Sequence, residues 1–121
     1  MHPAQPYLLD DWFAEWLPDD PIYGPAARFL EGLVDTNPEA AWDFIVALIE
    51  RAASDEALQC VAAGPLEDLL CDHGPQFIER AEHLARTNTR FRTALAIVRG
   101  ETRMDASTQK RLRAVAGHVS A

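Results

Sequence analysis

Apolar residues recur along almost the whole chain at intervals of three and four, and no segment alternates apolar and polar residues. This spacing is the period of an α-helix and not that of a half-buried strand. It predicts helices at about residues 7–17, 25–35, 38–52, 55–63, 65–72, 75–87, 89–98 and 106–117. The segment "AAWDFIVALIERAA" (40–53) is apolar around much of its circumference, which is typical of a central, mostly buried helix.

Proline and capping residues mark where these helices begin. Proline at the first helical position gives up an amide that has no partner there, and four dipeptides fit this role: Gly24-Pro25, Asn37-Pro38, Gly64-Pro65 and Gly74-Pro75. Asn37, Ser54 and Asn88 are expected N-caps. Short connections favour antiparallel neighbours. We therefore expect an all-α fold over residues 1–121, a single compact domain of about six to eight short helices in an irregular or short solenoid-like bundle.

Length and charge narrow the class of protein. The 121 residues suit one domain. The net charge of −8 disfavours nucleic acid and anionic membranes as partners. Residues 1–60 carry 12 acids and 2 arginines, a net of −10, whereas residues 61–121 carry 7 acids and 9 bases, a net of +2. This asymmetry indicates either an interaction face or attraction between the two halves.

Cysteine usage and apolar runs bear on the compartment. Cys60 and Cys71 are the only cysteines, too few for a disulfide scaffold, and we expect both as buried free thiols. No apolar run is long enough to span a bilayer, and the N-terminus lacks the pattern of a signal peptide. We expect a cytoplasmic protein without a cofactor.

The segment "GPLEDLL" (64–70) carries the first candidate chemistry. If Gly64 caps a helix, Glu67 can fold back to its amide, and Asp68 lies in the first turn where acids are favoured. Adjacent helical residues do not face each other, so the two carboxylates form a poor acid–base pair. The alternative is a small metal-dependent or acid–base enzyme that uses Glu67, Asp68, Cys71 and His73, although their spacing matches no known closed zinc site.

Two surfaces are candidates for binding. The first predicted helix places aromatic rings beside acids, a combination found at protein-binding hot spots, although its tryptophans also fit a core stripe. With the acids of "GPLEDLL", the predicted partner-binding residues are Asp10, Asp11, Trp12, Glu15, Trp16, Asp19, Asp20, Glu67 and Asp68. Residues 80–113 have a net charge of +6, which indicates either a phosphate-binding surface around Phe91 or a solvated face paired with the acidic half.

Three segments carry a resemblance to a known family. "NPEAAWDFIVALIERA", "AAGPLEDLL" and "RFRTAL", in this order, resemble a small bacterial family of unknown function over about residues 37–99. The resemblance implies a compact helical domain and supplies no catalytic residue. The helix pairs also look a little like HEAT-type repeats, which implies stacked antiparallel helices and a protein-binding surface.

No sequence motif of nucleophilic catalysis, phosphate binding or metal binding is present. The leading prediction is therefore a non-catalytic, acidic protein-binding module from a bacterium. Its most concrete form is an immunity or antitoxin-like protein that neutralises a basic partner. A helical adaptor or a homodimer is the third possibility, beside the enzyme described above.

Overall fold

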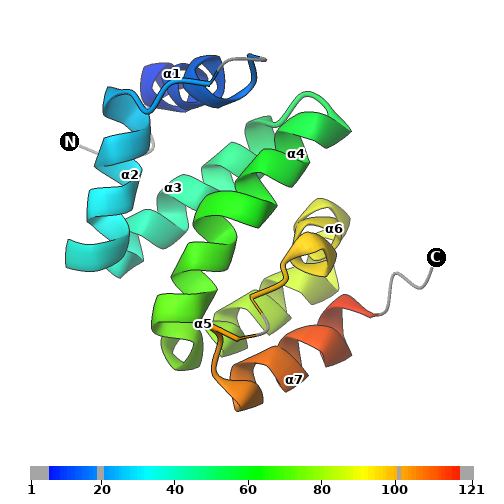
Figure 1. The fold of residues 1–121 in the computed structure, drawn as a ribbon. Coiled ribbons are helices and arrows are strands. Elements are labelled where there is room, and N and C mark those ends of the chain that lie inside the picture. Colours follow the sequence, from blue (N-terminus) through cyan, green and yellow to red (C-terminus); the bar gives the residue numbers. More distant parts are fainter. Residues whose placement is uncertain (1–5, 19–20, 101, 118–121) are drawn as a thin grey trace.

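The computed structural model describes residues 6–18, 21–100 and 102–117. Every regular element in this part of the chain is helical, as Figure 1 shows. The all-α prediction is confirmed. The elements in order are α1 (Pro6–Trp16), α2 (Pro25–Thr36), α3 (Pro38–Arg51), α4 (Asp55–Val61), the π-helix η1 (Ala62–Leu66), α5 (Glu67–Thr87), α6 (Thr89–Ile97) and α7 (Ala106–Ala116).

Helix α3 lies at the centre of the bundle. It contacts α1, α2, α4, α5 and α6, and Figure 1 shows it running beside α4 and α5. Phe44, Ile45 and Leu48 on α3 are fully buried, which confirms the prediction of a central helix. The Trp42 ring stacks on Phe77 of α5, with ring centroids 5.6 Å apart. These contacts unite the described helices around one hydrophobic core.

The Gly64-Pro65 pair does not begin a helix, so the prediction of Gly64 as an N-cap is wrong. The backbone stays helical from Asp55 up to the kink at His73. Pro65 lies inside η1, where the Glu67 amide donates to the Ala62 carbonyl, five residues back. Proline lacks an amide and its ring clashes with the carbonyl four residues earlier. The wider π-turn absorbs this conflict without ending the helix.

The Gly74-Pro75 pair follows a real kink. His73 has φ −136° and ψ 30°, which are not helical, and the chain resumes its helix just before Pro75. Gly74 is buried at this point because Thr108 of α7 lies against it. A Cβ on Gly74 would be 2.7 Å from the Thr108 side chain. The kink and the small residue together let α5 and α7 approach closely.

The predicted caps at Asn37, Ser54 and Asn88 are in place. Asn37, Ser54 and Asn88 accept hydrogen bonds from the amides of Ala40, Ala57 and Phe91. Asp105, which the sequence pattern did not single out, caps α7 by accepting from the Thr108 amide at 3.0 Å. None of the described helices has both the length and the apolar character that a membrane span requires.

Candidate functional site

The aromatic residues predicted to bind a partner divide between core and surface. Trp12 is 2% exposed, whereas Trp16 keeps 38% of its surface exposed. The two rings lie 6.0 Å apart, centroid to centroid. The core interpretation therefore holds for Trp12, and Trp16 is the tryptophan of α1 that a partner can reach.

The acids of the first helix also differ. Asp10 accepts two hydrogen bonds from Arg51 at 2.7 and 3.1 Å, and this guanidinium lowers the pKa of Asp10. Asp11 is exposed. Asp19 and Asp20 lie outside the described residues. Of these four predicted residues, the structure thus places Asp11 as an exposed acid and Asp10 in an ion pair.

Glu15 has a structural task that the sequence pattern did not reveal. Its carboxylate is buried and accepts from the amides of Ala26 and Ala27, both at 2.9 Å. It thereby satisfies the open amides at the start of α2, where the helix dipole favours a negative charge. Glu15 offers no surface to a partner. The signal was indirect: a glycine N-cap, here Gly24, has no side chain to accept from these amides.

The two acids of "GPLEDLL" anchor the loop between α6 and α7. Glu67 does not fold back on Gly64, as the sequence suggested, but accepts from the Arg99 amide at 3.0 Å. Asp68 accepts from Arg103 at 3.2 Å through one carboxylate oxygen. Burial raises the pKa of Asp68, and the charges of Asp72 and Glu67 add to the rise, while Arg103 opposes it.

His73 is held by α2, whereas Cys71 lies close enough to the two carboxylates for their charges to act on its thiol. The His73 Nε2 donates to the Val34 carbonyl of α2 at 2.7 Å, a contact that fastens the kink of α5 to α2. Cys71 is a free, half-buried thiol, as is Cys60, and burial raises the pKa of both thiols. The described residues contain no group of His, Cys, Asp and Glu placed to hold a metal ion.

A groove of about 240 Å³ brings together several residues from separate predictions. It lies between α1 and α2 on one side and η1 and α5 on the other. Buried apolar side chains form its floor, and its rim carries exposed aromatic rings and acids. The lining residues are Trp12, Trp16, Tyr23, Ala27, Leu30, Glu31, Val34, Asp35, Gly64, Pro65, Asp68 and Asp72.

The π-turn at Gly64-Pro65 forms one wall of this groove. A Cβ on Gly64 would meet nothing within 4 Å, so the absence of a side chain at this position leaves the groove open on this side. Turns of this kind occur often at functional sites. The groove is smaller than the ~300–1,000 Å³ of pockets for drug-sized ligands, and its volume suits a single side chain.

The rim of the groove has an excess of negative charge. Within the described part of the chain, Asp35 and Asp72 accept no hydrogen bond and form no ion pair, and both are exposed. The neighbouring Glu31 carboxylate raises the pKa of Tyr23. The four carboxylates of the rim outnumber the two guanidinium groups near them, that of Arg103 on Asp68 and that of Arg28, whose charge acts on Tyr23.

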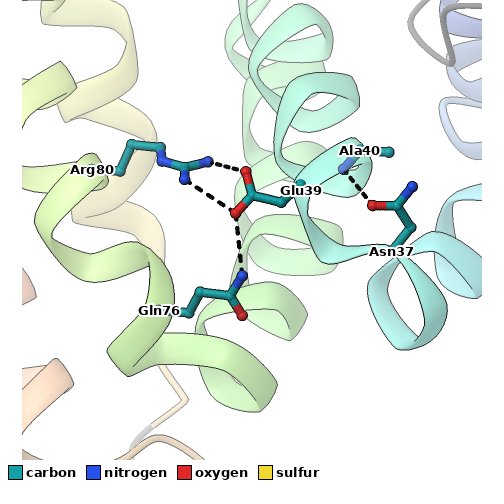
Figure 2. A network of polar contacts seen from close by, with 5 residues as sticks. All are labelled: Asn37, Glu39, Ala40, Gln76 and Arg80. Atoms are coloured by element: carbon teal, nitrogen blue, oxygen red, sulfur yellow. Dashed lines mark hydrogen bonds and ion pairs between the residues drawn. The ribbon is translucent and has the colours of Figure 1, made fainter.

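Ion pairing between the halves explains little of the charge asymmetry. Glu39 and Arg80 join the two halves through hydrogen bonds of 2.8 and 3.1 Å, with Gln76 donating to the same carboxylate (Figure 2). The pairs Asp10–Arg51, Asp68–Arg103 and Glu82–Arg111 each lie within one half.

The basic segment is not arranged around an exposed Phe91 ring. Phe91 is fully buried, so its ring cannot stack on a base. Arg90 donates to the Glu50 carbonyl at 3.0 Å, which turns this guanidinium toward the protein. Two further hollows, of about 570 and 610 Å³, lie elsewhere, and neither combines exposed aromatic rings with several unpaired acids.

The comparison with known families matches the model of a family of unknown function, DUF6869, to residues 22–119. The chain belongs to the DUF6869 family. The match is wider than the resemblance over residues 37–99 and takes in α2 to α7. The DUF6869 region thus supplies every lining residue of the groove except Trp12 and Trp16, which lie on α1. No curated protein and no solved structure matches the chain.

Proposed function

We propose that this DUF6869 protein is a non-catalytic binding module that receives a basic segment of another protein in the groove between α1, α2, η1 and α5. One observation carries the proposal: exposed rings and unpaired carboxylates share the rim of a groove with an apolar floor. Aromatic anchors near desolvated pockets are typical of binding hot spots. The carboxylates supply the complementarity to a positive partner.

The charge of the first half supports the same partner. The net charge of residues 1–60 is −10, and of the ion pairs described above only Glu39–Arg80 brings a positive charge from the other half to offset it. A negative field of this kind speeds the encounter with a basic protein. The most concrete form is an immunity or antitoxin-like protein of a bacterium, which covers a basic toxin surface.

The test is capture from the native host with a matched pair of charge variants. Asp35→Lys/Asp72→Lys reverses two exposed acids of the groove. Asp43→Lys/Glu50→Lys reverses two exposed acids of α3, away from the groove, with the same change in net charge. We expect the wild type and the α3 variant to retain one stoichiometric basic protein at moderate salt, and the groove variant to lose it.

A second experiment tests the immunity function itself. The captured protein, expressed alone, should arrest growth, and co-expression of the wild-type chain should restore it, while the groove variant should not. Loss of the partner in both variants, or in neither, contradicts the groove as the binding site. A wild-type chain that is dimeric by light scattering and captures nothing favours the homodimer instead.

A further inference from the structure

The chemistry of the groove distinguishes between the two common cations of proteins. A lysine ammonium is a strongly hydrated point charge, whereas an arginine guanidinium is planar, less hydrated and able to stack on an aromatic face while it donates in its own plane. The rim offers both kinds of contact. Trp16 and Tyr23 expose 38% and 51% of their surface, and Asp35 and Asp72 provide carboxylates with open acceptor sites.

Elsewhere in the same chain, one arginine lies against aromatic rings and donates to a carboxylate. The guanidinium carbon of Arg80 lies 5.0 Å from the Phe77 ring centroid and 5.8 Å from that of Trp42. Its two terminal nitrogens donate to the Glu39 carboxylate, as Figure 2 shows. Two aromatic rings and one carboxylate therefore bind an arginine side chain between α3 and α5. The groove also has aromatic rings and carboxylates, but no arginine of this chain pairs with its Asp35 or Asp72 within the described residues.

The arrangement around Asp68 keeps the groove open to a second guanidinium. Arg103 contacts one of the two Asp68 oxygens and belongs to the loop between α6 and α7. Arg103 and Arg28 together bring two positive charges to four acids of the rim, so a deficit of positive charge remains. An apolar floor that includes buried Leu30 and Val34 suits the methylene stem of a long side chain.

We infer that the groove binds an arginine side chain of the partner, with its guanidinium against the rings of Trp16 and Tyr23 and hydrogen-bonded to Asp35 and Asp72. This inference rests on the proposed function and specifies the residue that the groove selects. Lysine at the same position provides charge but loses the planar stacking and the paired hydrogen bonds.

The test uses two synthetic peptides of equal charge, acetyl-GGRGRGG-amide and its lysine counterpart, titrated into the full chain and followed by NMR. We expect the arginine peptide to bind about two- to fivefold more tightly, the range of an exposed cation–π contact, and to shift the Trp16 indole signal. Tyr23→Ala should remove part of this preference, and Tyr23→Phe, which keeps the ring, should retain it. Asp35→Asn/Asp72→Asn should weaken both peptides, whereas Asp43→Asn/Glu50→Asn should weaken neither.

The outcomes separate the two proposals. Equal affinity for both peptides, or no shift of the Trp16 signal, overturns the arginine inference. The proposed function still stands in that case if the groove variant loses the basic protein. In the opposite case, the arginine peptide binds selectively, but the groove variant captures the basic protein as well as the wild type does. The arginine site is then real, and the proposed function is wrong.

Discussion

At the scale of single residues, the buried Glu15 carboxylate is the side chain whose removal or displacement has the clearest consequence. Its two oxygens cap α2, and Gly24 leaves the space that they occupy. An alanine Cβ at position 24 would lie 2.6 Å from the Glu15 Cδ. We expect Gly24→Ala to displace the carboxylate, leave the amides of Ala26 and Ala27 unpaired and lower the free energy of unfolding by about 1–3 kcal/mol. Urea denaturation followed by circular dichroism measures this change.

A second glycine on the same helix provides the control. Gly32 lies in the middle of α2, and a Cβ there would meet nothing within 4 Å. Alanine at a helical position of this kind restricts the unfolded chain, so Gly32→Ala should raise the free energy of unfolding by about 0.4–1 kcal/mol. Opposite signs for the two variants support the role of Glu15. A neutral Gly24→Ala shows that the carboxylate finds another acceptor position.

At the scale of elements, the crossing of α5 and α7 depends on the absence of a side chain at Gly74. Alanine is favoured over glycine in a helix by about 1 kcal/mol, but its Cβ would lie 2.7 Å from the Thr108 side chain. Thr108 is fully buried and has no space to move, so overpacking of about 1–3 kcal/mol should outweigh the helical gain. We expect Gly74→Ala to lower the melting temperature.

Thr108→Ala tests the cause of that loss. The double variant should be more stable than the sum of the single changes predicts, by about 0.5 kcal/mol or more, because the two residues share one contact. Strict additivity would mean that the kink at His73, and not the crossing, is what glycine preserves.

The same two helices are joined by an ion pair that makes stability depend on pH. Arg111 of α7 donates to both oxygens of Glu82 on α5 and lowers the pKa of Glu82 below its ordinary value of 4.5. The native state therefore favours the ionised form. This contribution is fully present above pH 4.5 and is lost as the pH falls toward the native pKa. Glu82→Gln should be less stable than wild type at pH 7, and the difference should shrink by pH 3 in paired thermal melts.

Local sequence signals predicted the helices well. The predictions failed where the structure depends on contacts between residues that are distant in the sequence. The helical period and the caps at Asn37, Ser54 and Asn88 act within a few residues, so the sequence displays them directly. The Gly64-Pro65 pair has the local signature of a helix start, yet core packing on both sides keeps the helix continuous through a π-turn. Glu15 and its amides are 11 and 12 positions apart, and no local pattern connects them.

The groove could not be predicted from the sequence for the same reason. Trp16 and Asp68 were predicted to bind a partner, but nothing in the sequence indicated that α1 and the "GPLEDLL" turn meet. Asp35, Asp72 and Tyr23 were not singled out because each is an ordinary exposed polar residue until the fold brings them to one rim.

At the scale of the whole molecule, the distribution of charge and the groove should act on different steps of binding. The acids of the first half are spread over α1 to α4, and their summed field acts at the distance of encounter. The groove acts only after contact, when rings and carboxylates exclude water around the bound side chain. A partner should therefore associate faster because of the whole acidic half, and dissociate slowly because of a few residues.

Stopped-flow kinetics with the captured basic protein measures these two steps. Raising the salt should slow association by about tenfold or more, since screening shortens the reach of surface charges. Asp43→Lys/Glu50→Lys and Asp35→Lys/Asp72→Lys change the net charge equally, so both should slow association at low salt. Only the groove variant should also speed dissociation, because only its residues contact the bound partner. Equal dissociation rates for the two variants would show that the acidic half attracts the partner while another surface holds it.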